Sequence, residues 1–467
     1  MNGGKNMLNM IGIGISSLIV YVVAILILNI KLKRKMGEAM MWSSLLLLII
    51  GTVFGNMSFT GAVADSFTYA AKQEVVYAGL AFVFMAYVMD TSGVISRLVA
   101  ILNSLLGKLP GGSGYVATIG CALFGMVSGV ASANTAAIGA VTIPWMKDTG
   151  WSSERAAAII AGNGGLGNVF PPSSTMLLLL GLDNVSKELS AGELYVGLLS
   201  IGVVVLAYRL ALVFYFAKKD GLKAVPNEQV IPFGQALKEN ASSLLIFLGI
   251  IIPLALTMGP TGAAIKANFA GVNGAFKSIS LIFYIPILIT FFAIIEGYKY
   301  LPQSISGWKD AIEGCLGRFS ELGALLFFAF VSSRLLTKLG LGKEFGAIFE
   351  VMGNYSPLIV MIVVCVIITA MVGPFNSTGT TTALGAVSYA ALRSVGLSPV
   401  TSAVAFINLV SNQACVPPNS APIYIACGIA EVDEPMKIFK DLVIYYALPE
   451  VIIVFLIMIK LIPVIGG

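Results

Sequence analysis

Two successive prolines interrupt a long apolar segment in the stretch Gly167-Asn168-Val169-Phe170-Pro171-Pro172-Ser173-Ser174. A second pair interrupts a later apolar segment in Asn412-Gln413-Ala414-Cys415-Val416-Pro417-Pro418-Asn419-Ser420. Proline lacks the backbone N–H and clashes with the carbonyl four residues earlier, so each pair predicts a helix that is broken in the middle. The small and polar residues before each pair favour an unwound loop at the break.

These stretches belong to an internal repeat. A shift of 246 positions aligns residues 135–174 with residues 381–420 without a gap, and 11 of the 40 positions are identical. Both proline pairs fall in the same register. Each unit is expected to contain a lead-in helix (75–88; 322–331), an amphipathic stretch (94–109; 335–351), a segment broken by small polar residues, and the proline-broken helix.

The chain has 467 residues, of which 57% are hydrophobic and only 11% are charged. A soluble protein carries roughly 25% charged residues, so a soluble globular fold, a disordered chain and a coiled coil are excluded. A net charge of +5 over this length gives no support for nucleic-acid binding. The sequence contains no His, which excludes the usual catalytic triads and histidine metal sites, and its five isolated Cys are expected to pack as small apolar residues.

The composition indicates a polytopic membrane protein, because about 20 apolar residues suffice to cross a bilayer as a helix. A basic cluster at 31–35 follows the first apolar run, which places the N-terminus outside and the cluster inside. The first lead-in helix then runs inward and the second runs outward, so the two units are predicted to be inverted. Apolar runs occur at 10–30, 41–54, 75–88, 195–217, 242–258, 279–295, 322–331 and 442–461.

We therefore predict an all-α polytopic membrane fold with two inverted structural repeats, each with a re-entrant hairpin and a discontinuous transmembrane helix. Residues 1–73 are expected to form N-terminal scaffold helices, 74–182 the first repeat, and 183–320 further scaffold helices and connecting loops. Residues 321–430 are expected to form the second repeat, and 431–467 a C-terminal helix. The hairpin tips are predicted at 128–135, entering from the cytoplasm, and at 373–380, entering from outside.

The breaks predict binding sites for a cation and for an anion. Each proline pair leaves two carbonyls without an intrahelical donor, and such carbonyl oxygens suit Na⁺. A proline in the first helical turn is also expected to open a half-helix at mid-membrane, whose positive end fits an anion. The alternative is that these are ordinary kinked helices whose polar residues join helix to helix.

The candidate Na⁺ ligands of the first repeat are Ser128, Ser132, Asn134, Thr135, Asn163, Gly165, Gly167 and Asn168. Those of the second repeat are Asn376, Ser377, Thr378, Thr380, Asn412, Gln413 and Ala414. The candidate substrate-binding residues are Pro171, Pro172, Ser173, Ser174, Pro417, Pro418, Asn419 and Ser420. Two charged residues lie well inside predicted spans, away from their ends: Arg209 is expected to snorkel to the inner interface, and Glu450 follows Pro449 in the last span.

The sequence resembles the large membrane subunit of tripartite ATP-independent periplasmic (TRAP) transporters, the DctM-like family. The matching stretches are Ser92–Leu98, Phe124–Lys147, Gly167–Ser173, and Val416–Pro418 followed by Gly428–Ala430. The similarity extends from about residue 74 to about residue 461. In the second hairpin tip this sequence has no acidic residue, whereas the family commonly has one.

The resemblance implies an elevator-type transporter that imports a small organic acid, such as a C4-dicarboxylate, with Na⁺ as coupling ion and no cofactor. It also implies residence in the inner (cytoplasmic) membrane, a small four-helix membrane subunit and a periplasmic substrate-binding protein. The uncharged hairpin tips are also similar to those of divalent-anion/sodium symporters, so a stand-alone symporter that needs no binding protein stays open. A channel or a membrane enzyme is disfavoured, because the spans contain no pore-like ring of charge and no nucleophile paired with a base.

Overall fold

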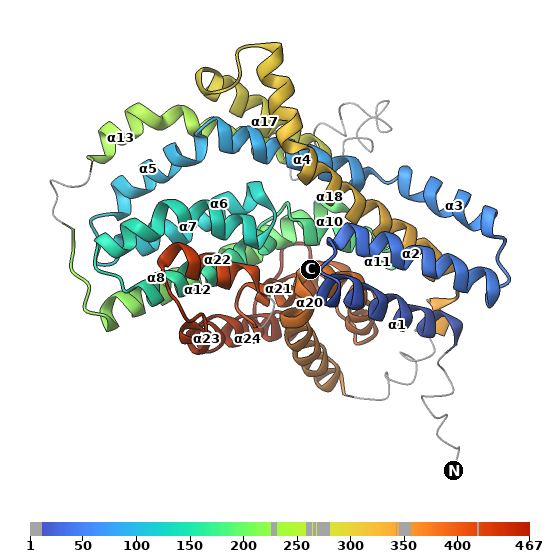
Figure 1. Cartoon of the computed structure of the whole chain (residues 1–467). Coiled ribbons are helices and arrows are strands. Elements are labelled where there is room, and N and C mark those ends of the chain that lie inside the picture. Colours follow the sequence, from blue (N-terminus) through green and yellow to red (C-terminus); the bar gives the residue numbers. More distant parts are fainter. Residues whose placement is uncertain are drawn as a thin grey trace.

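The computed structural model describes residues 12–225, 231–257, 281–341, 343–344, 356–417 and 420–467, with the single positions 264 and 268. Within these ranges every regular element is a helix and none is a strand, as the sequence predicts (Figure 1). The helices form two groups, which we call the peripheral group and the central group.

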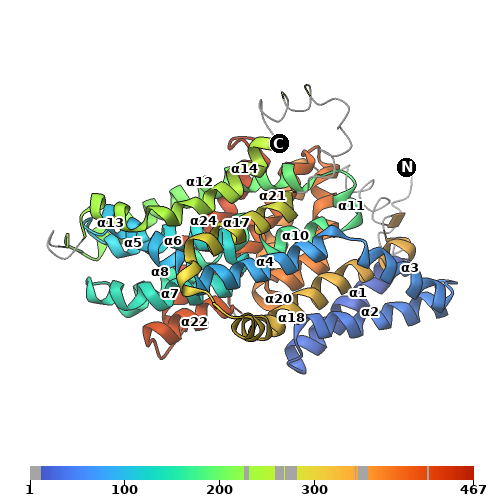
Figure 2. The ribbon, with the colours of Figure 1, turned by 90° about the horizontal axis from the view of Figure 1, so that it is seen from above.

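The peripheral group contains the N-terminal helices and those of the middle of the chain. Helix α18 packs against α2, α3 and α4, and α17 packs against α4 and α14. In both ribbon views α1, α2, α3 and α18 lie together at one edge of the molecule (Figures 1 and 2). The members are α1 (Ile13–Leu26), α2 (Met36–Val53), α3 (Phe59–Ala71), α4 (Glu74–Thr91), α14 (Leu248–Thr257), α17 (Leu281–Gly297) and α18 (Ile305–Lys338).

The central group contains both proline-broken helices. Helix α8 packs against α7 and α22, and α21 packs against α12, α20 and α24. The long members are α6 (Gly112–Ser128), α7 (Ala131–Asp148), α8 (Ser153–Gly164), α12 (Ala191–Lys219), α20 (Pro357–Ser394), α21 (Pro399–Ser411), α22 (Ala421–Ala430) and α24 (Leu448–Met458). The short members are α9 (Leu166–Val169), α10 (Ser174–Leu180), α11 (Asp183–Ser186), η7 (Asn412–Ala414), α23 (Met436–Leu442) and the π-helical turn η8 (Val443–Ala447).

Further elements at the boundary of the groups are α5 (Val94–Leu106), α13 (Phe233–Asn240) and the 3₁₀ segment η4 (Ala241–Phe247). Helix α5 packs on α6 and on α13. An apolar cavity lies between α5, α6 and the peripheral helices, and it is lined by residues that include Met89, Leu98, Phe124, Phe247 and Ile289. Apolar side chains therefore line this part of the boundary between the groups.

Four helices in the described ranges are long and apolar enough to cross a membrane. They span Ala191–Lys219, Phe233–Pro253, Phe283–Tyr300 and Met436–Met458, and they correspond to four of the predicted runs. Two bent pairs, Val76–Met89 with Val94–Leu106 and Ile305–Gly317 with Leu322–Lys338, raise the number to six. The remaining predicted runs fall on shorter apolar helices, which include Ile13–Ile25 and Gly37–Val53.

The two lead-in helices differ in where they bend. In the first half α5 follows α4 at an angle of 63°, and it covers most of the predicted amphipathic stretch 94–109. In the second half α18 bends by 44° between Gly317 and Leu322 and then continues to Lys338. The amphipathic stretch predicted at 335–351 therefore begins inside α18, and its residues 342 and 345–351 lie outside the described ranges.

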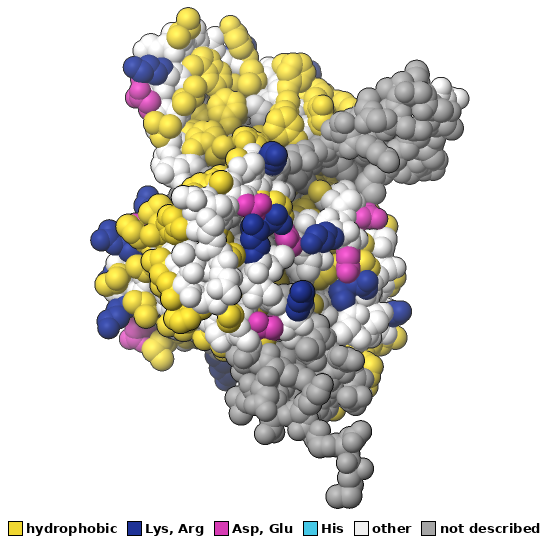
Figure 3. Space-filling view, turned by 90° about the vertical axis from the view of Figure 1, so that its right-hand side faces the viewer, with side chains coloured by type: hydrophobic (Ala, Val, Ile, Leu, Met, Phe, Trp, Pro, Cys, Tyr) yellow, Lys and Arg dark blue, Asp and Glu magenta, His cyan; other side chains and the backbone are white. Residues whose placement is uncertain are grey.

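The placement of apolar and charged side chains is typical of a membrane protein. All five cysteines are buried and none forms a disulfide, which confirms that they pack as small residues in the interior. Many large apolar side chains, such as Val53, Phe214 and Val366, are exposed on the helix surfaces. Figure 3 shows the face at one end of the helices, where Lys, Arg, Asp and Glu side chains gather in the middle and apolar side chains flank them.

Candidate functional site: two polar clusters at the broken helices

The first broken helix consists of α8, α9 and α10, but the prolines do not open its last part as expected. Helix α10 begins at Ser174, after Ser173, whose hydroxyl accepts the backbone N–H of Met176 at 3.1 Å. Pro171 and Pro172 lie in the linker before it. A residue before proline is driven out of the α-helical region, and serine is a favourable N-cap, so the helix starts two residues later.

A helical hairpin, formed by α6 and α7, packs its turn against this linker. Gly129 sits in the turn with φ +60°, a conformation that side chains rarely adopt. Its carbonyl accepts the backbone N–H of Ser174 at 3.0 Å and the Ser174 hydroxyl at 3.1 Å. A methyl group on Gly129 would lie 3.0 Å from the Pro172 carbonyl oxygen. The hairpin turn and the break of the same repeat are therefore in direct contact.

Three candidate ligands of the first repeat meet around Gly164, and we call them the first cluster. Asn134 donates its amide to the Gly164 carbonyl at 3.3 Å and to the Cys121 carbonyl at 2.9 Å. A methyl group on Gly164 would lie 2.1 Å from the Thr135 hydroxyl oxygen, so glycine leaves the room that Thr135 occupies. Asn163 donates its amide to Thr118 at 2.8 Å. All three cluster side chains are fully buried, and Asn134 Oδ1, Thr135 Oγ1 and Asn163 Oδ1 have no hydrogen-bond partner.

The other candidate residues of the first repeat play packing or capping parts. Ser128 is half-buried at the end of α6, and its hydroxyl reaches the Val130 carbonyl only at 3.5 Å. Ser132 is half-buried on α7. Gly167 packs against the Val130 carbonyl, and buried Asn168 has an amide nitrogen without a partner. The side chains of Ser173 and Ser174 are already engaged with backbone groups.

The second broken helix repeats this plan with different details. The hairpin is α20, which consists of two helical parts that meet at a kink, where Asn376 adopts a non-helical conformation with φ 54°. A methyl group on Gly373 would lie 2.3 Å from the Pro417 carbonyl oxygen, so this hairpin also packs on its own break. Helix α22 begins at Ala421 after Ser420, and Pro422 occupies its first turn. Pro418 and Asn419 lie outside the described residues.

Unpartnered polar atoms also occur on the second hairpin and break, and we call Thr380 and Asn412 the second cluster. Thr380 and Asn412 are buried, and Thr380 Oγ1, Asn412 Oδ1 and Asn412 Nδ2 have no hydrogen-bond partner. Thr380 stands in the same repeat register as Asn134, 246 positions earlier. Sequence reasoning missed Asn408, which is buried in α21 with an unpartnered Oδ1. An asparagine within an apolar helix just before the break was the available signal.

Several candidates of the second repeat already have partners. Asn376 Oδ1 accepts the backbone N–H of Gly379 at 3.0 Å, so it caps the second part of α20. Gln413 Oε1 accepts the backbone N–H of Ser377 at 2.8 Å, which joins hairpin and break. The Thr378 carbonyl accepts the Thr382 hydroxyl. Ala414 is buried at the end of η7, Pro417 is half-buried, and Ser420 is buried with an unpartnered hydroxyl.

The two breaks touch each other at a place that we call the junction. A methyl group on Gly165 would lie 2.8 Å from the Ser411 carbonyl oxygen and 3.4 Å from Ala414 Cβ. The Cys415 thiol lies 3.8 Å from the Gly162 carbonyl oxygen, to which it donates. Backbone from both repeats thus meets within van der Waals distance between the two clusters.

Arg209 does not snorkel. Its Nη2 donates to Glu450 Oε2 at 3.0 Å, and the two side chains are 3% and 0% exposed. A lone Arg within a span reaches for the interface, but a carboxylate on a neighbouring helix satisfies it inside the protein. Helices α12 and α24, which carry these residues, both pack on α21.

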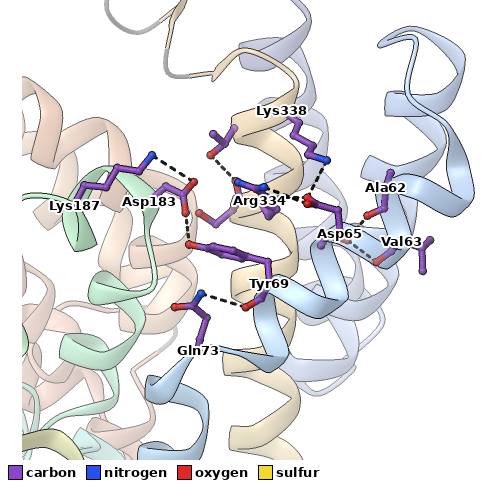
Figure 4. A network of polar contacts seen from close by, with 12 residues as sticks. Ala62, Val63, Asp65, Tyr69, Gln73, Asp183, Lys187, Arg334 and Lys338 are labelled. Carbon is purple, nitrogen blue, oxygen red and sulfur yellow. Dashed lines mark hydrogen bonds and ion pairs between the residues drawn. The ribbon is translucent and has the colours of Figure 1, made fainter. Parts of the chain in front are cut away.

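A polar network joins α3 and α18 of the peripheral group to α11 of the central group (Figure 4). Asp65 on α3 pairs with Arg334 and Lys338 on α18, each at 2.8 Å, and these cations hold the pKa of its carboxyl well below the usual range. Tyr69, one turn along α3, donates its hydroxyl to Asp183 of α11. Lys187 lies 3.9 Å from the same carboxylate.

In the part of the chain that the structure describes, no three His, Cys, Asp or Glu side chains come together as a metal site. The unpartnered oxygens of the two clusters are all neutral amide or hydroxyl oxygens. Such a donor set fits a hard cation of low charge and does not fit a divalent ion held by carboxylates.

Comparison with known proteins agrees with this architecture. A family model described as "Tripartite ATP-independent periplasmic transporter, DctM component" matches residues 23–465. The chain belongs to this family. It is therefore a multi-pass membrane permease and not an enzyme.

The similar curated proteins are TRAP permeases with different named substrates. The 2,3-diketo-L-gulonate large permease YiaN of Escherichia coli is 25% identical over 402 residues, 84% of this chain and 87% of that protein. The C4-dicarboxylate large permease DctM of Rhodobacter capsulatus is 22% identical, over 75% of this chain and 77% of that protein. The isethionate permease DctMQ of Oleidesulfovibrio alaskensis is 25% identical, and this chain spans 54% of its length.

Two solved transporters share the fold. The YdaH transporter of Alcanivorax borkumensis superposes with a TM-score of 0.62 at 15% identity, over 91% of this chain and 97% of that one. MtrF of Neisseria gonorrhoeae gives a TM-score of 0.63 at 11% identity, over 87% and 85%. At these identities the likeness concerns the fold alone.

Proposed function

We propose that this DctM-family permease uses a Na⁺ gradient to import a small organic acid. The observation that carries the proposal is the set of buried oxygens without partners: Asn134 Oδ1, Thr135 Oγ1 and Asn163 Oδ1 in the first cluster, with Thr380 Oγ1 and Asn412 Oδ1 in the second. Each of them lies on a hairpin or at a break, as the sequence predicts for the coupling-ion sites.

A buried polar atom without a partner destabilises a protein by about 1–3 kcal/mol, so several together need an explanation. A cation can bind several oxygens at once, whereas a donor side chain satisfies one or two of them. The carbonyls of Gly167 and Asn168 add to the first cluster, because Pro171 and Pro172 provide no N–H to them. In secondary transporters unwound backbone carbonyls near the membrane centre coordinate Na⁺.

The anion is expected close to the start of α22. This helix has ten residues, and its N-cap residue Ser420 has a buried hydroxyl without a partner. A helix N-terminus presents free N–H groups and a partial positive charge, which favour a carboxylate. The named substrates of the relatives, which include C4-dicarboxylate, isethionate and 2,3-diketo-L-gulonate, are all organic anions.

The transport movement that we propose is a displacement of the central group against the peripheral group. The two groups are separately packed, and the part of their boundary around the cavity is lined by apolar side chains, which favours sliding. Inverted repeats would make the inward-facing and outward-facing arrangements exchange the roles of the two hairpins. We propose that the protein lies in the inner membrane with its N-terminus outside.

The partners that we propose are a small membrane subunit and a periplasmic substrate-binding protein, in accord with the word tripartite in the family description. A stand-alone symporter is the alternative, because the hairpin turns carry uncharged polar residues. The two differ in whether the purified chain transports alone.

Reconstitution into proteoliposomes tests the proposal. Labelled C4-dicarboxylates, hydroxy acids and sugar acids are supplied with an inward NaCl gradient or with choline chloride, with and without the co-encoded small subunit and binding protein. We expect accumulation of at least one acid that requires Na⁺ and all three components. Accumulation that is independent of Na⁺ would refute the coupling, and full transport by this chain alone would favour the stand-alone symporter.

A further inference from the structure

The ion pair between Arg209 and Glu450 lies beside the junction of the two broken helices. The Arg209 guanidinium lies over the Tyr446 ring, 4.5 Å from its centre. Cys415 follows η7 and lies within the second break, two residues before Pro417. Two elements, η8 through Tyr446 and α24 through Glu450, meet the guanidinium that α12 carries.

The same side chains also reach the first break. A methyl group on Gly162 would lie 2.3 Å from the Tyr446 ring, so this ring packs directly on the backbone next to Asn163. The Gly162 carbonyl accepts the Cys415 thiol at 3.8 Å. Tyr446 is held in the π-helical turn η8, a rare geometry that is frequent at functional sites. The ion pair thus reaches the first break through the Tyr446 ring, and the Cys415 thiol joins the second break to the same glycine, Gly162.

A contribution to stability does not by itself explain this ion pair. Arg209 Nε, Arg209 Nη1 and Glu450 Oε1 are buried without hydrogen-bond partners, so the charges are incompletely satisfied. A buried ion pair of this kind is often no more stable than apolar side chains of the same volume. Unlike apolar side chains, an ion pair holds its two side chains in one relative orientation, because its hydrogen-bond geometry is specific.

We propose that Arg209 and Glu450 are positioning residues that hold the two breaks in one relative arrangement and thereby couple the two cation clusters. This inference rests on the proposed function, since it requires that the clusters bind Na⁺. Na⁺ binding at one break orders the backbone there, and this backbone contacts the other break at the junction. The ion pair transmits that order, because it holds Tyr446 against Gly162, the glycine that the Cys415 thiol also contacts.

The experiment measures Na⁺ binding without a transported acid. The purified full-length protein is heated in detergent while NaCl replaces choline chloride at constant total salt, and the rise in unfolding temperature gives the half-saturating Na⁺ concentration and its steepness. The variants are R209K, E450Q and the apolar double variant R209M/E450M. The double variant removes the charges together, so it leaves no unpaired buried ion.

The matched control is E296Q. Glu296 is 2% exposed and pairs with Arg97, but this pair joins α5 to α17 and lies outside both clusters and the junction. It is expected to lower the unfolding temperature without changing the half-saturating Na⁺ concentration. E296Q therefore distinguishes the general effect of losing a buried ion pair from the specific effect of losing the pair between Arg209 and Glu450.

We expect R209M/E450M to fold, to raise the half-saturating Na⁺ concentration about 5-fold and to flatten the titration. E450Q should do the same with a lower unfolding temperature, and R209K should be milder because it keeps the charge. An unaltered Na⁺ titration in a folded double variant would overturn the inference and leave Na⁺ binding intact. Loss of folding in all three variants would show a purely structural role and also overturn it. A wild-type protein without any Na⁺-specific stabilisation would overturn the inference together with the proposed coupling.

Discussion

Replacement of Gly165 by Ala tests the junction directly. Gly165 follows α8 with φ −58° and ψ −25°, a conformation that alanine adopts freely, so backbone strain is not introduced. The added methyl group would lie 2.8 Å from the Ser411 carbonyl oxygen, a distance that real Cβ contacts essentially never show. The Ser411 carbonyl is backbone and cannot rotate away as a side chain would, so the two broken helices must move apart.

The expected cost follows from these distances. Overpacking of a well-packed interior costs about 1–3 kcal/mol, and alanine regains up to about 1 kcal/mol relative to glycine in helical backbone, which leaves a net loss of about 1 kcal/mol. The Gly165 carbonyl itself is retained. A change in Na⁺ binding would therefore report the altered spacing of the breaks and not the loss of a ligand.

The assay is thermal unfolding of the purified variant in NaCl and in choline chloride. The G428A variant is the control, because Gly428 is an exposed position of α22 with open space around it, and alanine there should raise stability slightly. We expect G165A to unfold at a lower temperature in both salts and to need more Na⁺ for half-saturation. A G165A protein with wild-type stability would refute the contact, and one that is destabilised with an unchanged Na⁺ titration would refute the role of the junction in positioning ligands.

Three further predictions address the clusters, the topology and the polar network. T135A and T380A should each be as stable as wild type or more stable in choline chloride, because an unpartnered buried hydroxyl is removed, yet gain less stability from NaCl. Single cysteines at Ser132 and Ser377, in a background without native Cys, should react with impermeant reagents from the cytoplasmic and the outer side respectively, and labelling of both from one side would refute the inverted arrangement. D65N should lower the unfolding temperature above about pH 4, where the carboxylate of Asp65 is ionised in both states, and the difference from wild type should shrink as the pH falls below this value. Because Asp65 is half-exposed, this contribution is expected to be below about 1 kcal/mol.

The plan of the site could be predicted from the sequence because its elements are local. A proline pair removes two N–H donors wherever it stands, so both breaks follow from covalent structure alone. The turn at 128–135 and its counterpart at 373–380 are marked by small polar residues in apolar segments. Tertiary structure adds that each hairpin packs on the break of its own repeat, through Gly129 and Pro172 or through Gly373 and Pro417.

The state of each polar atom could not be predicted, because it depends on neighbours that are distant in the sequence. Asn376 and Gln413 were expected to bind an ion, but their side-chain oxygens accept backbone N–H groups of the second hairpin. Asn163 was also expected to bind an ion. Its amide nitrogen donates to Thr118, 45 residues away, and its side-chain oxygen has no hydrogen-bond partner. The residue types identify the candidates, and the packing decides which of them have an oxygen left.

The pairing of Arg209 with Glu450 shows which sequence signal was present but not used. Each residue alone within an apolar span has one inexpensive solution, which is to reach the interface, and that reasoning placed Arg209 at the inner surface. One cation and one anion in separate spans have a second solution, because each can satisfy the other inside the protein. This second solution requires that the two helices approach, and α12 and α24 do so because both pack on α21. Opposite charges in different spans should therefore be considered as a pair before either is assigned to the interface.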